Sequence, residues 1–381
     1  MTSPLLPRYG TASLAEVLPS VLAALGVPGP TPIALAPVRA ACVLLIDGLG
    51  AELLATHAAD APYLSAMADA GPLTVGFPST TPISLATLGT GLPPGGHGIV
   101  GLAFDPGDDD LLDTLRWTRT QDGRHVDQRE VHVPEIVQPS ETALQRAAAA
   151  GIVVTAVAPA FQRDSGLTRA ALRGARFRGV LALGDLAAEV GAALAGPERR
   201  LCYGYHSDLD TLGHVHGPAT LPWRLQLRQI DLLVSTIAAA LPPDALLVVT
   251  GDHGMVTTTR RYDADTDDDL QRGVRLLGGD ARARHVYAVD GAAPDVLAAW
   301  RTALGDDAWV VTRDEAIAAG WFGPLGPHVA GRIGDVVVAM RGEATVVRTG
   351  AEPQLAKLVG QHGSLTSAEQ LVPLLVAGPA G

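Results

Sequence analysis

The chain has 381 residues, of which 47% are hydrophobic, so it can build a large core and is not intrinsically disordered. Asp and Glu number 40 against 28 Lys and Arg, and this formal net charge of −12 argues against partners such as nucleic-acid polymers or an anionic membrane. An anionic substrate would need a local positive charge, for which a bound metal ion is the obvious source.

The only two cysteines, Cys42 and Cys202, each lie in an apolar run typical of a buried strand, which excludes a disulfide scaffold and a cysteine-rich zinc site. Residues 1–8 lack a basic region followed by an apolar one, so we expect no secretory signal. Polar residues and proline interrupt the long apolar stretches, so no segment is expected to span a bilayer. These features favour a cytoplasmic protein.

Short apolar runs at residues 41–46, 151–157 and 245–250 predict strands that are buried on both faces, as in a parallel sheet. Helical patterns lie between them, at residues 140–150, 185–194 and 223–241. This alternation predicts a doubly wound α/β fold, with a mostly parallel sheet flanked by helices. Such folds form their sites at the carboxyl ends of the strands, where Asp47 and Asp252 lie.

Residues 259–347 have a different pattern, which predicts strands at 285–289, 309–312 and 335–340. Helices are predicted between them at 294–304 and 314–319. We therefore expect a small α+β insert, or lid domain, at 259–347. Residues 1–258 and 348–381 would form the catalytic core.

A threonine-rich segment at residues 77–99 contains a candidate nucleophile. Pro82 suits the first position of a helix, which would make Thr81 the N-cap. A hydroxyl there would lie among unpaired N–H groups at the positive end of the helix dipole, an arrangement that binds anions and favours an alkoxide. From this segment alone, a plain helix cap is the simpler interpretation.

Four further segments carry possible metal ligands. Asp210 and His214 are spaced i, i+4, so one helical turn would put both on one face. Asp252 and His253 follow a strand between two glycines, and His362 precedes a glycine near the C-terminus. Carboxylate and imidazole together suit Zn²⁺ or Mn²⁺. With Asp47, the chain offers three carboxylates and three imidazoles, enough for two divalent ions. His206 and His216 do not share the i, i+4 spacing of Asp210 and His214, and we interpret them as supporting or surface residues.

In this order, the motifs resemble those of the alkaline phosphatase superfamily, and most closely the nucleotide pyrophosphatase/phosphodiesterase family. The motifs are Asp47-Gly, the Thr81 segment with Gly-Leu-Pro-Pro-x-x-His97-Gly-Ile, Asp210-x-x-Gly-His214, Gly-Asp252-His253-Gly-Met and His362-Gly. The resemblance covers nearly the whole chain.

The resemblance implies a metal-dependent hydrolase that cleaves phosphodiester or nucleotide pyrophosphate bonds through a threonine nucleophile, Thr81. It implies two divalent ions, with zinc as first choice and manganese as second. Asp210, His214 and His362 would hold one ion. Asp47, Asp252 and His253 would hold the other, with the Thr81 hydroxyl reaching toward it. The partner would be a small-molecule phosphoester, with nucleotides among the candidates.

Three points stay open at this stage. Leu102 stands where diesterases of the family usually carry an asparagine that binds a phosphoryl oxygen, so the same site would also suit a phosphomonoesterase or phosphonate hydrolase. Thr80 is an alternative nucleophile beside Thr81. A catalytically idle, metal-stabilised scaffold that binds a partner is a third reading.

Overall fold

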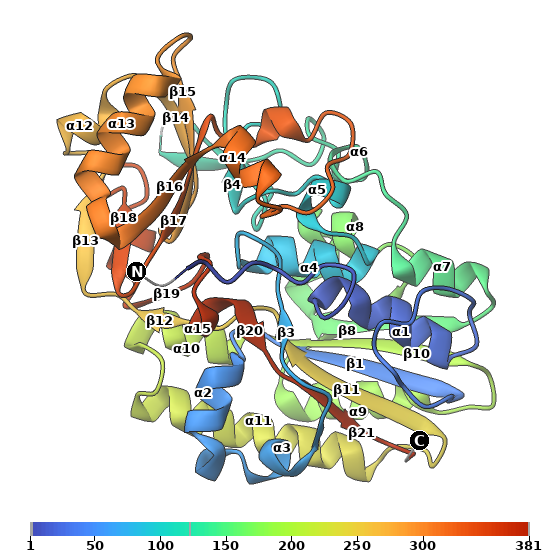
Figure 1. Cartoon of the computed structure of the whole chain (residues 1–381). Coiled ribbons are helices and arrows are strands. Elements are labelled where there is room, and N and C mark those ends of the chain that lie inside the picture. Colours follow the sequence, from blue (N-terminus) through green and yellow to red (C-terminus); the bar gives the residue numbers. More distant parts are fainter. Residues whose placement is uncertain (1–2, 122, 380–381) are drawn as a thin grey trace.

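The computed structural model describes residues 3–121 and 123–379. Its largest sheet has seven strands and lies in the lower part of the view in Figure 1. The strand order is β2-β21-β11-β1-β10-β8-β9. The bounds are β2 Ala68–Asp69, β21 Leu374–Ala377, β11 Ala245–Gly251, β1 Ala40–Ile46, β10 Arg200–His206, β8 Val153–Pro159 and β9 Arg176–Val180. The five strands from β11 to β9 are parallel, β21 runs antiparallel to its neighbour β11, and β2 pairs antiparallel with β21. The predicted doubly wound α/β fold is confirmed.

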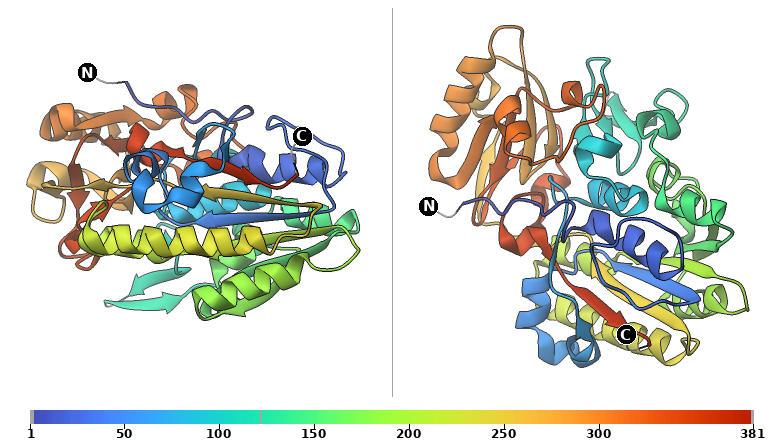
Figure 2. Two further views of the ribbon diagram at one scale, coloured as in Figure 1. Left: turned by 90° about the horizontal axis from the view of Figure 1, so that it is seen from below. Right: turned by 45° about the vertical axis from the view of Figure 1, so that its right-hand side comes forward.

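Helices cover both faces of this sheet, which is why β1 is buried along its whole length (Figure 2). Alternate residues of β1 enter two different hydrophobic clusters, as the period of a strand requires. Val43 packs in the cluster that contains α1, α4 and α7, and Leu44 packs in the one that contains α9 and α11. These helices span Val17–Ala24 (α1), Thr81–Thr90 (α4), Ala143–Ala149 (α7), Leu183–Leu194 (α9) and Leu221–Ala239 (α11).

Shorter helices connect these layers. Their bounds are α2 Ala51–Thr56, α3 Pro62–Ala66, α5 Pro94–His97, α6 Pro134–Val137, α8 Gly166–Ala171, α10 Asp208–His216 and α15 Ser367–Gln370. Short strand pairs join the C-terminal segment to the rest of the chain: β3 Leu73–Thr74 with β20 Leu371–Val372, and β12 Val256–Thr257 with β19 Gly360–Gln361. Within the described ranges, no helix is long and apolar enough to cross a membrane.

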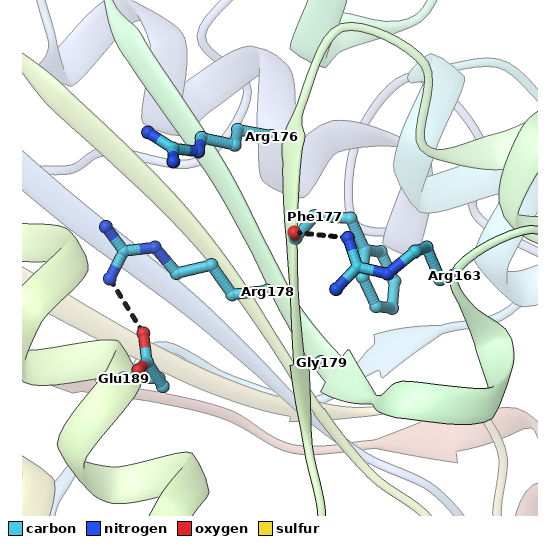
Figure 3. A pocket seen from close by; sticks show the side chains of 6 residues that line it. All are labelled: Arg163, Arg176, Phe177, Arg178, Gly179 and Glu189. Carbon is cyan, nitrogen blue, oxygen red and sulfur yellow. Dashed lines mark hydrogen bonds and ion pairs between the residues drawn. The ribbon is translucent and has the colours of Figure 1, made fainter.

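The β9 edge of the sheet is protected by arginines (Figure 3). The Arg163 guanidinium donates to the Phe177 carbonyl, at 3.0 Å, and lies over the Phe177 ring. Arg178 pairs with Glu189 on α9 at 2.7 Å. Charged side chains on an edge strand discourage pairing with another chain. We therefore interpret these arginines as protecting β9 from pairing with a strand of another molecule.

The predicted insert contains a four-stranded antiparallel sheet in the order β14-β15-β17-β16. Its elements are α12 Asp268–Gln271, β14 Val274–Asp280, β15 Ala283–Ala288, α13 Ala293–Leu304, β16 Ala308–Thr312, α14 Arg313–Ala318 and β17 Val336–Met340. A parallel pair, β13 Arg260–Asp263 and β18 Ala344–Val347, stands at its base. Each strand and helix expected in this segment is present within a few residues, whereas β14 was not expected. The domain boundaries at 259 and 347 stay predictions.

The insert packs closely on the segment that leads into α4. The Phe77 ring meets Trp321 edge to face, with 4.9 Å between the ring centroids, and meets Phe322 at 5.4 Å. A buried ion pair between Arg282, in the turn before β15, and Glu369 of α15 adds a second connection. A small sheet of β4 Ala103–Phe104, β5 Leu112–Asp113, β6 Thr118–Gln121 and β7 Arg124–Asp127 follows α5.

Candidate active site

Thr81 is the first residue of α4, and Thr80 is its N-cap. The expectation that Thr81 would be the N-cap was therefore wrong. The N–H groups of a first helical turn have no intrahelical partner, so proline fits at the second position as well as the first, and Pro82 could not fix the cap. The Thr81 side chain still lies at the positive end of the helix, and its Oγ1 is 3.2 Å from Nε2 of His253.

Asp47 and Asp252 follow the neighbouring strands β1 and β11 and come together at the carboxyl edge of the sheet. One oxygen of each is held: Asp252 Oδ1 accepts the Gly48 N–H at 2.9 Å, and Asp47 Oδ2 accepts the Tyr205 hydroxyl. The other oxygens, Asp47 Oδ1 and Asp252 Oδ2, are buried and have no hydrogen-bond partner among the described residues. Buried carboxylate oxygens without a partner are costly unless a cation compensates them.

Asp210 and His214 lie one turn apart on α10, as predicted from their spacing, with Asp210 Oδ1 3.4 Å from His214 Nε2. His362 arrives from the C-terminal segment, and its Nε2 is 3.2 Å from His214 Nε2 and 3.7 Å from Asp210 Oδ1. Gly48 lets α10 approach the sheet this closely, because a Cβ at that position would lie 3.0 Å from the Asp210 Cα.

The three imidazoles are oriented in the same way. Each Nδ1 contacts a backbone carbonyl: His214 with Gly360 at 2.7 Å, His253 with Gly254 at 3.1 Å, and His362 with Ser79 at 2.9 Å. A carbonyl oxygen can only accept, so each Nδ1 carries the proton and each Nε2 points to the centre of the site. Metal-binding histidines usually have this outer hydrogen bond.

The ligand atoms fall into two overlapping groups. Asp210, His214 and His362 bring their atoms within 4.8 Å of one another, and Asp47, Asp210 and His253 do the same. Asp252 adjoins the second group, because its Oδ2 is 3.5 Å from His253 Nε2. Asp210 thus belongs to both groups, whereas the family resemblance implied that it would serve only one ion.

The charges in this cluster are uncompensated. Burial, followed by repulsion from Asp252 and Asp210, raises the pKa of Asp47 well above its usual range, and burial raises the pKa of Asp252. Burial, and then His253 and His214, lower the pKa of His362 well below that of free histidine. Buried carboxylate oxygens without partners therefore lie beside inward-facing imidazole nitrogens, a donor set that fits divalent cations.

The other histidines of these motifs fall in neither group. His206 is mostly buried beside Gln226, with 3.1 Å between His206 Nε2 and Gln226 Nε2, and His216 is exposed at the end of α10. His97 lies 3.0 Å from Thr87 Oγ1 and accepts the Ile99 N–H through Nδ1. Burial lowers the His97 pKa to about 3, so this neutral ring stabilises the loop after α5.

Sequence reasoning missed Tyr205. The strand alternation of β10 puts Tyr203 and Tyr205 on the same face, next to β1, and Tyr205 is one residue from the carboxyl end. That position was the available signal, because side chains there reach the site at the sheet edge.

The fold is that of the alkaline phosphatase superfamily. The chain belongs to the type I phosphodiesterase/nucleotide pyrophosphatase family, whose sequence pattern matches residues 41–365, and it is accordingly a hydrolase acting on phosphoester bonds.

Solved structures share the fold at low sequence identity. Murine ectonucleotide pyrophosphatase/phosphodiesterase 5 superimposes with a TM-score of 0.67 at 17% identity, covering 89% of this chain and 88% of the other. An inactive form of the murine protein in complex with AMP gives 0.68, and the human protein gives 0.66, at the same identity and coverage. No curated protein sequence matches the chain significantly.

Proposed function

We propose that this protein hydrolyses phosphodiester or nucleotide pyrophosphate bonds of small molecules, with Thr81 as nucleophile and two divalent cations, zinc in the first place, as cofactors. One observation carries the proposal. Unpaired carboxylate oxygens and inward-facing imidazole nitrogens from separate segments converge beside the Thr81 hydroxyl, which lies 3.2 Å from His253 Nε2.

The donor set divides between two ions. Asp210, His214 and His362 would hold one. Asp47, Asp252 and His253 would hold the other, near Thr81, and the central place of Asp210 would put its carboxylate close to both. Mixed oxygen and nitrogen ligands suit zinc, and manganese is the second choice. When bound, such ions lower the pKa of a hydroxyl and stabilise charge on a transferring phosphoryl group.

In the proposed reaction, Thr81 forms a covalent intermediate that water then hydrolyses. Deprotonated Thr81 Oγ1 attacks phosphorus, and the bond from phosphorus to the leaving oxygen breaks, which gives a phosphothreonine ester. The N-terminus of α4 favours negative charge at this position. Water then attacks phosphorus, releases the phosphate product and restores the Thr81 hydroxyl.

A nucleotide is the substrate class we favour, because a structural neighbour has been captured in complex with AMP. Leu102 is half-buried and offers no side-chain donor for a phosphoryl oxygen. A phosphomonoesterase or phosphonate hydrolase is therefore the alternative that the assays below must distinguish. The cytoplasmic location also stays a prediction, to be checked by cell fractionation.

Paired assays with metal analysis test the proposal. The purified protein is expected to contain two equivalents of zinc and to hydrolyse bis-p-nitrophenyl phosphate. Turnover of p-nitrophenyl phosphate alone would establish the monoesterase alternative. Bound metal without turnover of either ester would indicate an idle scaffold and overturn the proposal.

A further inference from the structure

Asp47 differs from the three imidazoles and from Asp252 in how its second atom is held. The three imidazoles and Asp252 are anchored by backbone groups. Asp47 Oδ2 is instead anchored by a side chain, the hydroxyl of Tyr205. A substitution can remove this anchor without disturbing the main chain.

The fold holds Tyr205 in place. β10 lies directly beside β1, with Tyr205 level with Leu45, and the Asp47 N–H donates to the His206 carbonyl at 2.9 Å. The tyrosine ring is 4% exposed and packs in the hydrophobic cluster beneath α4. The hydroxyl therefore has little freedom to move away from the carboxylate.

This contact selects which oxygen of Asp47 is available. A carboxylate rotates readily about its last torsion, which is broad. With Oδ2 bound to Tyr205, Oδ1 is left without a partner and lies 3.4 Å from His253 Nε2. We infer that Tyr205 is a positioning residue, which fixes the Asp47 carboxylate so that Oδ1 binds the cation beside Thr81. This inference rests on the proposed function.

Tyr203 provides a matched control on the same strand. It is 1% exposed and lies on the same face of β10, two residues before Tyr205. Its hydroxyl has no hydrogen-bond partner among the described residues. Tyr203→Phe and Tyr205→Phe thus remove the same atom from similar surroundings, and only the second breaks a contact with a proposed ligand.

The experiment measures metal affinity in the full-length protein. Metal-depleted wild type, Tyr205→Phe and Tyr203→Phe are titrated with Co²⁺, followed by visible absorption, and with Zn²⁺ against a chromogenic chelator. We expect Tyr205→Phe to weaken one of the two binding steps by about 10- to 100-fold, the usual effect of losing an outer hydrogen bond to a ligand. Tyr203→Phe should bind both ions as wild type does, and excess metal should restore turnover in Tyr205→Phe with KM unchanged.

A double-mutant comparison tests whether Tyr205 acts through Asp47. In an Asp47→Ala background, Tyr205→Phe should cause no further loss of metal affinity. Wild-type affinity in Tyr205→Phe, or an equal loss in Tyr203→Phe, would overturn the inference. A wild-type protein that binds no ion would instead overturn the proposed function, so the two failures are distinguishable.

Discussion

Thr81→Ala should remove catalysis and leave the fold and the bound metal nearly unchanged. The lost hydroxyl has one contact with a site residue, at 3.2 Å from His253 Nε2. Losing a hydrogen bond of this kind costs about 1 kcal/mol, and alanine's higher helix propensity returns roughly half of that. The net change in the free energy of unfolding should thus stay below about 1 kcal/mol.

The expected loss in rate is far larger. If Thr81 is the nucleophile, kcat should fall by at least about 10³-fold, which corresponds to about 4 kcal/mol in the activation barrier. Turnover of bis-p-nitrophenyl phosphate, metal content and urea unfolding are measured on the same preparation. Thr80→Ala is the matched control, because the Thr80 side chain makes no capping hydrogen bond in α4. Wild-type turnover in Thr81→Ala together with its loss in Thr80→Ala would refute the assignment.

Three further outcomes follow from the structure. Chelation with EDTA should abolish activity, and Zn²⁺ or Mn²⁺ should restore it. Full activity in a demonstrably metal-free sample would contradict this. His362→Ala should deplete one ion and spare the ion beside Thr81, whereas Asp47→Ala should do the reverse and block the covalent intermediate, as metal analysis and mass spectrometry would show. Burial raises the pKa of Asp280 to about 7 from 3.8, so the folded state retains a proton that the unfolded state loses, and stability falls as pH rises from about 4 to 7. Asp280→Asn should remove this loss. Between pH 5 and pH 8, the free energy of unfolding of the variant should rise by about 3 kcal/mol relative to that of wild type, measured by urea unfolding with chelator present. Equal pH dependence in both proteins would refute this prediction.

The central sheet could be predicted because its strands have a strong local signal. β1, β8 and β11 are continuous apolar runs, and such runs occur where both faces of a strand are covered. β14 and the small sheet β4–β7 have no such signal. β14 ends in two glycines and an aspartate, and the β6–β7 hairpin is largely exposed, so neither has the apolar pattern that identifies a strand.

The site was predictable where its geometry is local. The spacing of Asp210 and His214 fixes their common helix face. The position of Asp252 and His253 could be predicted because both residues come directly after a strand. Contacts between distant segments could not be derived from spacing. The position of Asp210 between both ligand groups, and the contact of Tyr205 with Asp47, depend on how β10, α10 and β1 pack in three dimensions.

Anomalous X-ray diffraction at the zinc absorption edge tests the central claim most directly, in crystals grown with Zn²⁺. Two peaks are predicted. One should lie about 2.0–2.1 Å from the Nε2 atoms of His214 and His362 and bind Asp210, and the other should lie equally close to His253 Nε2 and bind Asp47 and Asp252. No peak at this edge of the sheet, or a single peak that leaves His253 or His362 without a metal, would contradict the two-ion account.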